Sequence, residues 1–563
     1  MARAKLTAQK SNVHGIRRLI LECSLQDRSK ATLPLGASRL KAGSYSYPPD
    51  EIVVLTLKHL FGEDLEIDPV VQAWYNEWTD HCKELLEIVS QEDAEIPSLP
   101  WQEVLKPYQR VGVKFALASK GCIIGDDRGL GKTLQAISVA RALDAKRVLV
   151  VAPGYLKNGW RREIEHWTNQ FAVVCNGDRA KRESAIELFK DSPETPYLIV
   201  NYEMIREKVQ SGGYPQLLNM EWDVVLFDEA HRLKGRDSQW VIGAKKLKAK
   251  RKYLLTGNPI ANRPDEVWQL LNILDPNRFT SYWAFVEYFC NLVDTFFGKE
   301  IQGVRKEHLA QLQFTLQPYL IRRLKQEVAP WLPEKIHKVI EVELEGKQKT
   351  FYKVAEKHML LALESGGMEV IETVVEQNIR LQQAIANPAI IGGPDESIVE
   401  KTALEMLEDL LEAGEKVIVG LWFVDAVKLF SKKLSQRNIK HFVITGEVKA
   451  DARDTIVQQF KTLEEPCVLI GGIRAMSEGI NADECDHIIF MDKSWTPLDN
   501  EQFMDRIHRI TSTRTKNYYH IVVKDTVSED REETLQEKSE MIDEILAMKA
   551  VAEKVRKRHE SKA

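Results

Sequence analysis

The chain of 563 residues has none of the features that mark secreted, zinc-binding or membrane-spanning proteins. Its seven cysteines are odd in number, widely spaced and without a Cys-x-x-Cys pair, which favours reduced thiols over a disulfide framework or a zinc site. The N-terminus lacks the apolar run of a signal peptide, and no stretch approaches the ~20 apolar residues of a membrane span. These absences predict a cytosolic-type compartment.

A surplus of basic residues is also missing. With 78 Lys and Arg against 83 Asp and Glu, the net charge is −5, which speaks against a protein coated in basic surface. A local basic groove remains compatible with this balance, because phosphate contacts need only a few well-placed donors. The hydrophobic content of 44% and the charged content of 29% are ordinary for a globular protein, and the length predicts three or four domains.

From about residue 105 the apolar pattern predicts short buried strands that alternate with helices, which is typical of a parallel sheet covered on both faces. A helix-like stretch rich in charge and aromatics interrupts this pattern at 265–400, and the alternation resumes at 402. The expected strands are 122–125, 148–153, 197–201, 224–227 and 253–256 in a first lobe, and 416–421, 441–445, 467–470, 487–491 and 518–523 in a second. Outside the lobes we expect strands around 16–24 and 37–56, a helix at 69–91, a linker at 91–100 and a charged helix at 527–556.

The strongest chemical signal is the string Asp-Asp-Arg-Gly-Leu-Gly-Lys-Thr at 126–133, which follows an apolar strand and opens a helix. Two glycines let backbone N–H groups approach phosphates, and the helix N-terminus adds a positive dipole. The strict phosphate-loop pattern fails at Asp126, which stands in place of its first Gly, and the string alone also fits an ordinary strand-to-helix turn. The expected ATP-binding residues are Gly129 and Gly131 at the phosphates, Lys132 at the β- and γ-phosphates, and Thr133 on Mg²⁺.

The second half of the expected site is Asp-Glu-Ala-His at 228–231, which follows the apolar run Val-Val-Leu-Phe. Asp228 is expected to hold Mg²⁺, Glu229 to polarise the attacking water, and His231 to couple this segment to its neighbours. An acidic pair at a helix N-terminus explains the string equally well when it is taken alone. The phosphate loop in the same lobe favours a site that binds and hydrolyses ATP.

Further segments, in the same order, resemble the Swi/Snf-type ATPases of helicase superfamily two, which are double-stranded-DNA translocases with two RecA-like lobes. The family's loop typically reads Asp-Glu-x-Gly-Leu-Gly-Lys-Thr, which this chain matches at Asp126 and departs from at Asp127. Segment 105–113 resembles the adenine-side segment, which implies that Gln109 reads the base. Segments 150–160 and 201–204 resemble first-lobe DNA-contact segments, which implies DNA contacts at Lys157, Asn201 and Tyr202. Segment 255–262 resembles the segment that links hydrolysis to DNA, with Asn258 where the family usually has Thr.

Residues 321–335 (Ile-Arg-Arg-Leu-Lys…Leu-Pro-Glu-Lys) resemble a block that separates Swi/Snf-type motors from other superfamily-two helicases. Residues 381–388 resemble the family's second insertion. Taken without these matches, the pattern over 265–400 predicts only a helical spacer.

Segments of the second lobe resemble the other half of the family's cleft. Segments 444–460 and 474–481 resemble DNA and coupling segments, which implies contacts from Gly446 and Arg474. Segment 500–510 resembles the arginine-finger segment, and Arg506 and Arg509, three apart on an expected helix, are expected to share a face and to neutralise charge on the γ-phosphate. The chain departs from the family pattern at Met476, Ser477, Thr511 and Ser512.

The predicted fold is α/β, with two RecA-like parallel-sheet lobes, helical insertions, a small N-terminal domain and a C-terminal helix. The expected domains are 1–100 (accessory, recognising a DNA substrate), 101–275 (ATP-binding lobe), 276–400 (insertions), 401–526 (second lobe) and 527–563 (helix). The resemblance implies a DNA-stimulated ATPase, with ATP and Mg²⁺ as cofactors, that translocates on double-stranded or branched DNA in remodelling, rewinding or repair. Two alternatives stay open: a strand-separating DNA or RNA helicase, and a DNA-binding scaffold on an inactive motor fold. The expected location is the cytoplasm of a bacterial or virus-infected cell, or the nucleus if the source is eukaryotic.

Overall fold

The chain folds into two compact units in the computed structural model. One comprises the residues up to Leu324 together with the end of the C-terminal helix from Met541, and the other comprises Lys325–Glu540. Of the expected segments, parts of 255–262, 474–481 and 500–510, and the end of 527–556, lie outside the described residues. The structure describes residues 4–10, 16–208, 210, 212–236, 238–260, 263–295, 298–365, 370–448, 450–477, 480, 482–509 and 512–546.

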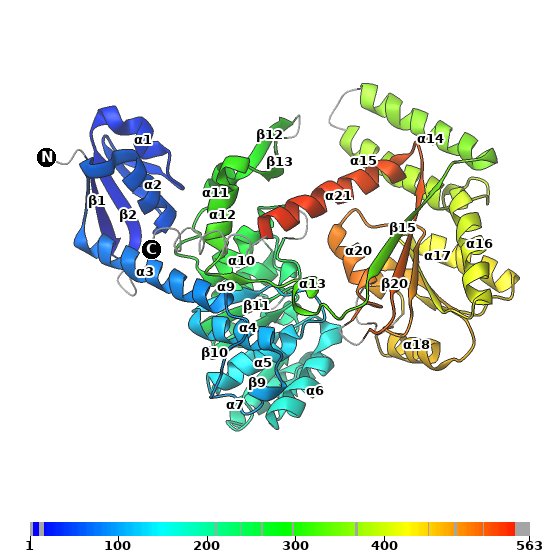
Figure 1. Ribbon diagram of the computed structural model, residues 1–563, viewed down its shortest axis with the longest axis horizontal. Helices are drawn as coiled ribbons and strands as arrows, with labels where there is room; N and C mark the ends of the chain where they lie inside the picture. Colours follow the sequence, from blue (N-terminus) through cyan, green and yellow to red (C-terminus); the bar gives the residue numbers. More distant parts are fainter. Residues whose placement is uncertain are drawn as a thin grey trace. The chain divides into compact units, whose positions relative to one another are not determined.

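A small mixed sheet, blue in Figure 1, opens the first unit, with strand order β3-β4-β2-β1-β5. The extended piece expected over 37–56 ends early, because the Asp50 carboxylate accepts a hydrogen bond from the Ile52 N–H and starts a helix at Glu51. The helix expected at 69–91 is confirmed, with Asp68 as its N-cap and Pro69 in its first turn. The elements are β1 Ala4–Lys10, β2 Ile16–Cys23, α1 Arg28–Thr32, β3 Ser38–Lys41, β4 Ser44–Tyr47, α2 Glu51–Phe61, β5 Leu65–Ile67 and α3 Pro69–Val89.

The first parallel sheet has seven strands in the order β14-β6-β11-β10-β7-β9-β8. Its central strands are buried on both faces, as their unbroken apolar runs predict, and the five expected strands are confirmed. β8 and β14 are too short to stand out in the sequence. The elements are α4 Pro107–Ala118, β6 Gly121–Ile124, α5 Lys132–Ala142, β7 Val148–Val151, α6 Lys157–Thr168, β8 Ala172–Val174, α7 Arg179–Asp191, β9 Tyr197–Val200, α8 Pro215–Asn219, β10 Glu221–Asp228, α9 Gln239–Lys246, β11 Lys248–Leu255, α10 Glu266–Leu274 and β14 Leu320–Ile321.

The expectation of a helix-like stretch over 265–400 is wrong at β14, given above, and at two further places. A hairpin of β12 and β13 follows a short aromatic helix, and β15 joins the second sheet as its edge strand beside β20. The elements are α11 Tyr282–Phe289, β12 Cys290–Thr295, β13 Gly298–Val304, α12 Leu309–Leu316, α13 Lys325–Val328, β15 Lys335–Val342, α14 Gly346–Ser365 and α15 Val370–Ala386.

The second unit contains a six-stranded parallel sheet in the order β15-β20-β19-β16-β18-β17, orange and yellow in Figure 1 apart from the green β15. Two parallel sheets with flanking helices and a small N-terminal sheet confirm the predicted α/β class. No helix in the part of the chain that the structure describes combines the length and apolar character of a bilayer crossing. The elements are α16 Ile398–Glu412, β16 Val417–Leu421, α17 Val424–Gln436, β17 His441–Ile444, α18 Ala450–Thr462, β18 Val468–Gly472, α19 Ile473–Met476, β19 His487–Phe490, α20 Pro497–Met504, β20 Lys516–Val523 and α21 Val527–Leu546.

Candidate active site

The residues expected to act in the first lobe, and Thr256 of the segment 255–262, follow the carboxyl ends of neighbouring strands. Lys132 comes after β6, Thr256 after β11, Lys157 after β7 and Asn201 after β9, while Asp228 ends β10. In a parallel sheet these ends meet at one edge, where open α/β folds bind their ligands. The topology therefore brings the phosphate loop and the acidic pair to the same edge, with β11 between their strands.

The phosphate loop has the backbone shape that its glycines predict. Gly131 has φ +75° and caps α5, and Gly129 has φ +80°. A side chain at Gly131 would also collide with its surroundings, because an added Cβ would lie 2.3 Å from the Gln109 amide nitrogen. Glycine at this position therefore allows both the left-handed turn and the close approach of α4.

Lys132 extends along the inside of the loop. Its ammonium donates to the carbonyl oxygens of Asp126 at 2.7 Å and Asp127 at 3.2 Å. Burial lowers the pKa of Lys132, and the charge of Glu229 opposes that shift. A nearby polyphosphate would stabilise the ammonium form, which fits the expected role of Lys132 at the β- and γ-phosphates.

Asp228 is held by two aromatic side chains from neighbouring segments. The Trp160 indole N–H donates to Asp228 Oδ2 at 2.7 Å, and the Tyr202 hydroxyl donates to the Asp228 carbonyl at 2.6 Å. Burial and the adjacent Glu229 charge raise the pKa of Asp228 to about 6. The role of Trp160 was not predicted, because no local pattern reveals a partner 68 residues away.

Glu229 adopts a strained backbone and a well-defined side-chain environment. Its φ of +49° is uncommon for a residue with a Cβ, and such outliers cluster at functional sites. His231 Nδ1 lies 3.3 Å from Glu229 Oε2 and 3.4 Å from Thr256 Oγ1, so His231 links the acidic pair to the segment after β11. Burial favours protonation, but His231, Arg128 and Lys132 outweigh it and hold the pKa of Glu229 well below its usual range.

The chemistry of these side chains fits Mg²⁺. Asp228 and Thr133 offer hard oxygen ligands, and a divalent cation would relieve the raised pKa of the buried Asp228 carboxyl. Among the residues that the structure describes, no group of three or more His, Cys, Asp or Glu side chains forms a metal cage. Mg²⁺ is usually bound by one or two carboxylates together with substrate phosphates, a role that Asp228 and Thr133 would fill here.

Two other predicted residues of this lobe, Gln109 and Lys157, make contacts within the protein. The Gln109 side chain bridges the Lys106 N–H and the Leu130 carbonyl, at 2.9 and 3.0 Å. Lys157 is buried and donates to the Cys175 carbonyl, and burial lowers its pKa to about 8. Their roles in binding adenine and DNA stay predictions.

Asn201 and Tyr202 also lie at the edge of the acidic site. The Asn201 amide donates to Glu203, while Tyr202 is only 1% exposed and contacts Asp228. Burial, followed by the charges of Asp228 and Glu229, raises the pKa of Tyr202 well above its usual value. The expected DNA contacts at Asn201 and Tyr202 stay predictions.

The second unit presents its two expected DNA-contact residues at one edge of its sheet. Gly446 follows β17 and Arg474 lies in α19 after β18, and both are exposed. Because β17 and β18 are parallel neighbours, their carboxyl ends lie side by side. A backbone N–H and a guanidinium at one exposed edge are suitable donors for phosphates.

Arg506 and Arg509 do not share a helix, which corrects that expectation. α20 ends at Met504, and the arginines lie in the turns that follow. Both guanidinium groups nevertheless donate to the same carbonyl, that of Ile480, at 3.2 Å each. Burial lowers the pKa of Arg509, and Asp483 and Asp505 oppose that shift.

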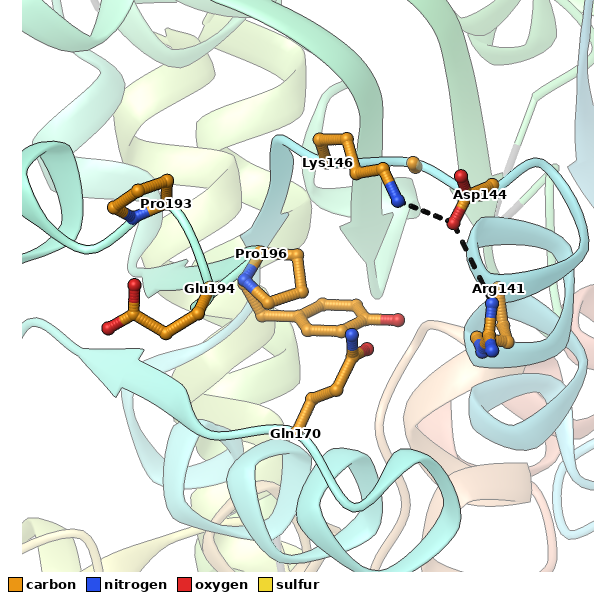
Figure 2. Close-up of a pocket in the computed structure, with 9 residues that line it drawn as sticks. Arg141, Asp144, Lys146, Gln170, Pro193, Glu194 and Pro196 are labelled. Atoms are coloured by element: carbon orange, nitrogen blue, oxygen red, sulfur yellow. Dashed lines mark hydrogen bonds and ion pairs between the residues drawn. The ribbon is translucent and has the colours of Figure 1, made fainter.

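A small depression of about 140 Å³ lies at the opposite, amino ends of β7 and β9 (Figure 2). Lys146 and Arg141 both reach the Asp144 carboxylate there, at 2.7 and 3.7 Å, across from Pro193 and Pro196. None of the predicted site residues lines it. The depression therefore lies at the opposite edge of the sheet from the expected nucleotide site.

Comparisons with known proteins cover most of the chain. Residues 69–390 match the model of the SNF2-related domain, and residues 402–511 match that of the helicase conserved C-terminal domain. Chromodomain-helicase-DNA-binding protein 6 of Mus musculus is 28% identical over 468 residues, which are 75% of this chain and 17% of that protein. Chromodomain-helicase-DNA-binding protein 7 of Homo sapiens is 29% identical over 469 residues, 75% of this chain and 15% of that protein. The chain thus spans less than a fifth of these relatives.

Among solved structures, the Sulfolobus solfataricus SWI2/SNF2 ATPase core in complex with dsDNA is similar at 24% identity and a TM-score of 0.38. That likeness covers 81% of this chain and 95% of the solved chain.

Proposed function

The chain belongs to the family of SNF2-related ATPases, and from this premise we propose that it is a DNA-stimulated motor that couples ATP hydrolysis to movement along double-stranded or branched DNA. The observation that carries the proposal is the arrangement at the edge of the first sheet. There, the Glu229 charge raises the pKa of Lys132, and the Lys132 charge lowers the pKa of Glu229. His231 connects Glu229 to Thr256. A hydrolytic site is thereby linked to a segment that resembles the family's coupling segment.

The first lobe supplies most of the groups that hydrolysis needs. The loop N–H groups and Lys132 hold the phosphates, and Asp228 and Thr133 would hold Mg²⁺, which would supply positive charge against the phosphates. Glu229, kept as a carboxylate, orients and polarises the attacking water. Its strained backbone and the hydrogen bond to His231 fix where that carboxylate points.

The second lobe supplies Arg506 and Arg509, which stabilise charge on the γ-phosphate when the lobes close. ATP then favours the closed state, and hydrolysis removes that preference, because a ligand shifts an equilibrium only by its differential affinity. Alternate gripping of DNA by the segment at Asn201 in one lobe and by Gly446 and Arg474 in the other moves the chain along a strand, while the buried Tyr202 holds Asp228. Such contacts are mainly to phosphates, so binding is tolerant of sequence and weakened by salt.

The N-terminal domain within residues 1–100 serves as the DNA-substrate recognition module. Residues 16–61 contain seven Lys and Arg against four Asp and Glu, in a chain of net charge −5. Two of those four acids, Asp50 and Glu51, are buried against Arg278, so the exposed surface is more basic than the count suggests. Over residues 1–100 as a whole the balance is 11 Lys and Arg against 15 Asp and Glu, so a phosphate backbone would meet the basic residues of 16–61 rather than a basic domain.

A translocation assay tests the proposed function. Movement along duplex DNA displaces a third strand bound in a triplex, with ATP and without separating the duplex, and Glu229→Gln serves as the inactive control. Displacement that depends on ATP and on Glu229 supports the motor. Efficient separation of a tailed duplex instead supports a strand-separating helicase. DNA binding with no ATP turnover on any DNA supports a scaffold.

A further inference from the structure

Arg323 forms a buried hydrogen-bond cluster on Asp126, the residue that departs from the strict phosphate-loop pattern. Arg323 Nε donates to Asp126 Oδ1 at 2.8 Å, and Arg323 Nη2 donates to Asp126 Oδ2 and to the Gln135 side-chain oxygen. The Gln135 amide donates to Asp126 Oδ2 at 2.9 Å, and Asp126 has no exposed surface. A glycine at position 126 would leave the half-buried Arg323 guanidinium without its carboxylate.

The backbone of the same segment runs alongside the start of the loop. β14 pairs with β6, the Gly125 N–H donates to the Ile321 carbonyl at 2.7 Å, and the Asp127 N–H donates to the Arg323 carbonyl at 3.0 Å. The start of the loop at 125–127 is therefore hydrogen-bonded to 321–323 through both main chain and side chains. Any shift of the loop on nucleotide binding also changes the position of this segment.

Lys325, the residue after Leu324, forms hydrogen bonds within the second unit. The Lys325 ammonium donates to Asp505 Oδ1 at 2.8 Å and to the His508 carbonyl at 3.0 Å. His508 Nε2 in turn donates to the Pro333 carbonyl at 3.0 Å. Residues 325–333 thus hold Asp505 and His508, which enclose Arg506 and directly precede Arg509.

We propose that residues 321–325 are a coupling segment, in which Arg323 is a positioning residue for the phosphate loop and Lys325 is a positioning residue for the arginines. Only Leu324 lies between Arg323 and Lys325, so the chain between these two hydrogen-bonded residues can extend very little. Nucleotide-dependent movement at 125–127 is passed to the arginine-bearing segment along this connection. This inference rests on the proposed motor function, and it gives Asp126 a role that the strict phosphate-loop pattern lacks.

The test compares Arg323→Gln, Lys325→Gln and the double variant with the wild-type chain. Each variant removes one anchor, so DNA-stimulated turnover is expected to fall about tenfold, within the range of ordinary coupling between sites. ADP affinity, read with a fluorescent analogue, stays within about threefold, because the nucleotide-binding groups themselves are intact. The double variant shows the same loss as either single variant, because all three break one connection. Arg437→Gln, which removes an exposed ion pair with Glu408, is the matched control without effect.

Several outcomes overturn the coupling segment. The proposal is wrong if Arg323→Gln keeps full DNA-stimulated turnover. It is also wrong if ADP affinity falls in proportion to turnover, because Arg323 then only supports the loop. Losses that add in the double variant also contradict it. Arg323→Lys keeps the positive charge but not the paired hydrogen bonds to the Asp126 carboxylate. Its turnover is expected to lie between those of Arg323→Gln and the wild-type chain, and this graded loss argues against a folding defect.

A second measurement separates this inference from the proposed function. If the wild-type chain is not stimulated by DNA, the motor proposal fails, and hydrogen exchange then decides on the coupling segment. ADP is expected to slow amide exchange across 325–333 in the wild-type chain and to have no such effect in Arg323→Gln. The inference is overturned if ADP leaves amide exchange across 325–333 unchanged in the wild-type chain.

Discussion

Replacing Arg278 is expected to loosen the N-terminal sheet from the first parallel-sheet lobe. Arg278 Nε donates to Asp50 Oδ2 at 2.8 Å and Nη2 donates to Glu51 Oε1 at 2.6 Å, and all three side chains are at most 3% exposed. Arg278→Met removes the cation and leaves two carboxylates buried. Breaking a buried pair in this way costs about 3–5 kcal/mol, because the remaining charges have no compensation.

Native-state hydrogen exchange of α2, which carries Glu51, measures this loss as a local opening free energy. A single unfolding midpoint would be hard to interpret in a chain of several domains. Arg437→Met is the matched control, since its pair with Glu408 is about half exposed on both sides and is worth about 0–1 kcal/mol. A loss in Arg278→Met no larger than in this control refutes the reasoning.

The same variant should depend on pH in a defined direction. Burial raises the pKa of Glu51 from 4.5 to about 7, against the opposing charge of Arg278. A carboxyl whose pKa is raised on folding stabilises the fold below its unfolded value, and this contribution is lost as the pH rises through the folded value. Removing Arg278 raises the pKa further, so the loss should be smaller at pH 5 than at pH 8. Equal losses at both pH values contradict this account.

Three further substitutions test the nucleotide site. Lys132→Ala should abolish measurable binding of a fluorescent ATP analogue, and retained affinity would exclude Lys132 from the phosphates. Glu229→Gln should bind ATP normally but hydrolyse it at least about 100-fold more slowly, the usual contribution of a positioned base, and turnover near wild type would remove Glu229 from the chemistry. Trp160→Phe loses only the N–H that reaches Asp228 Oδ2, so the Mg²⁺ concentration for half-maximal turnover should rise about 10–100-fold. Trp167→Phe, which loses a similar bond to Glu163 on the same helix, should leave that concentration unchanged.

The sheets could be predicted because their strands carry unbroken apolar runs, as at Val148–Val151, where all four side chains are buried. β15 was missed because it is an edge strand with a mixed burial pattern, so its side chains do not alternate cleanly. The alternating apolar pattern over 37–56 predicts a strand and does not reveal α2, which starts at the Asp50 cap.

At the candidate site, the sequence predicts residue types suited to phosphate but not the side chains that contact them. Trp160 and Arg323 reach their partners across 68 and 197 residues, and no local pattern records such contacts. The spacing of three predicts that the arginines share a helix, whereas α20 ends before them. Their shared contact with the Ile480 carbonyl depends on tertiary folding.

The most direct test of the central claim is steady-state ATP turnover by the full chain with and without DNA. Turnover should be low without DNA and rise at least about tenfold with duplex or forked DNA, the stimulation should weaken as salt increases, and Glu229→Gln should abolish it. Equal turnover with and without single-stranded, duplex and forked DNA would contradict the account of a DNA-driven motor.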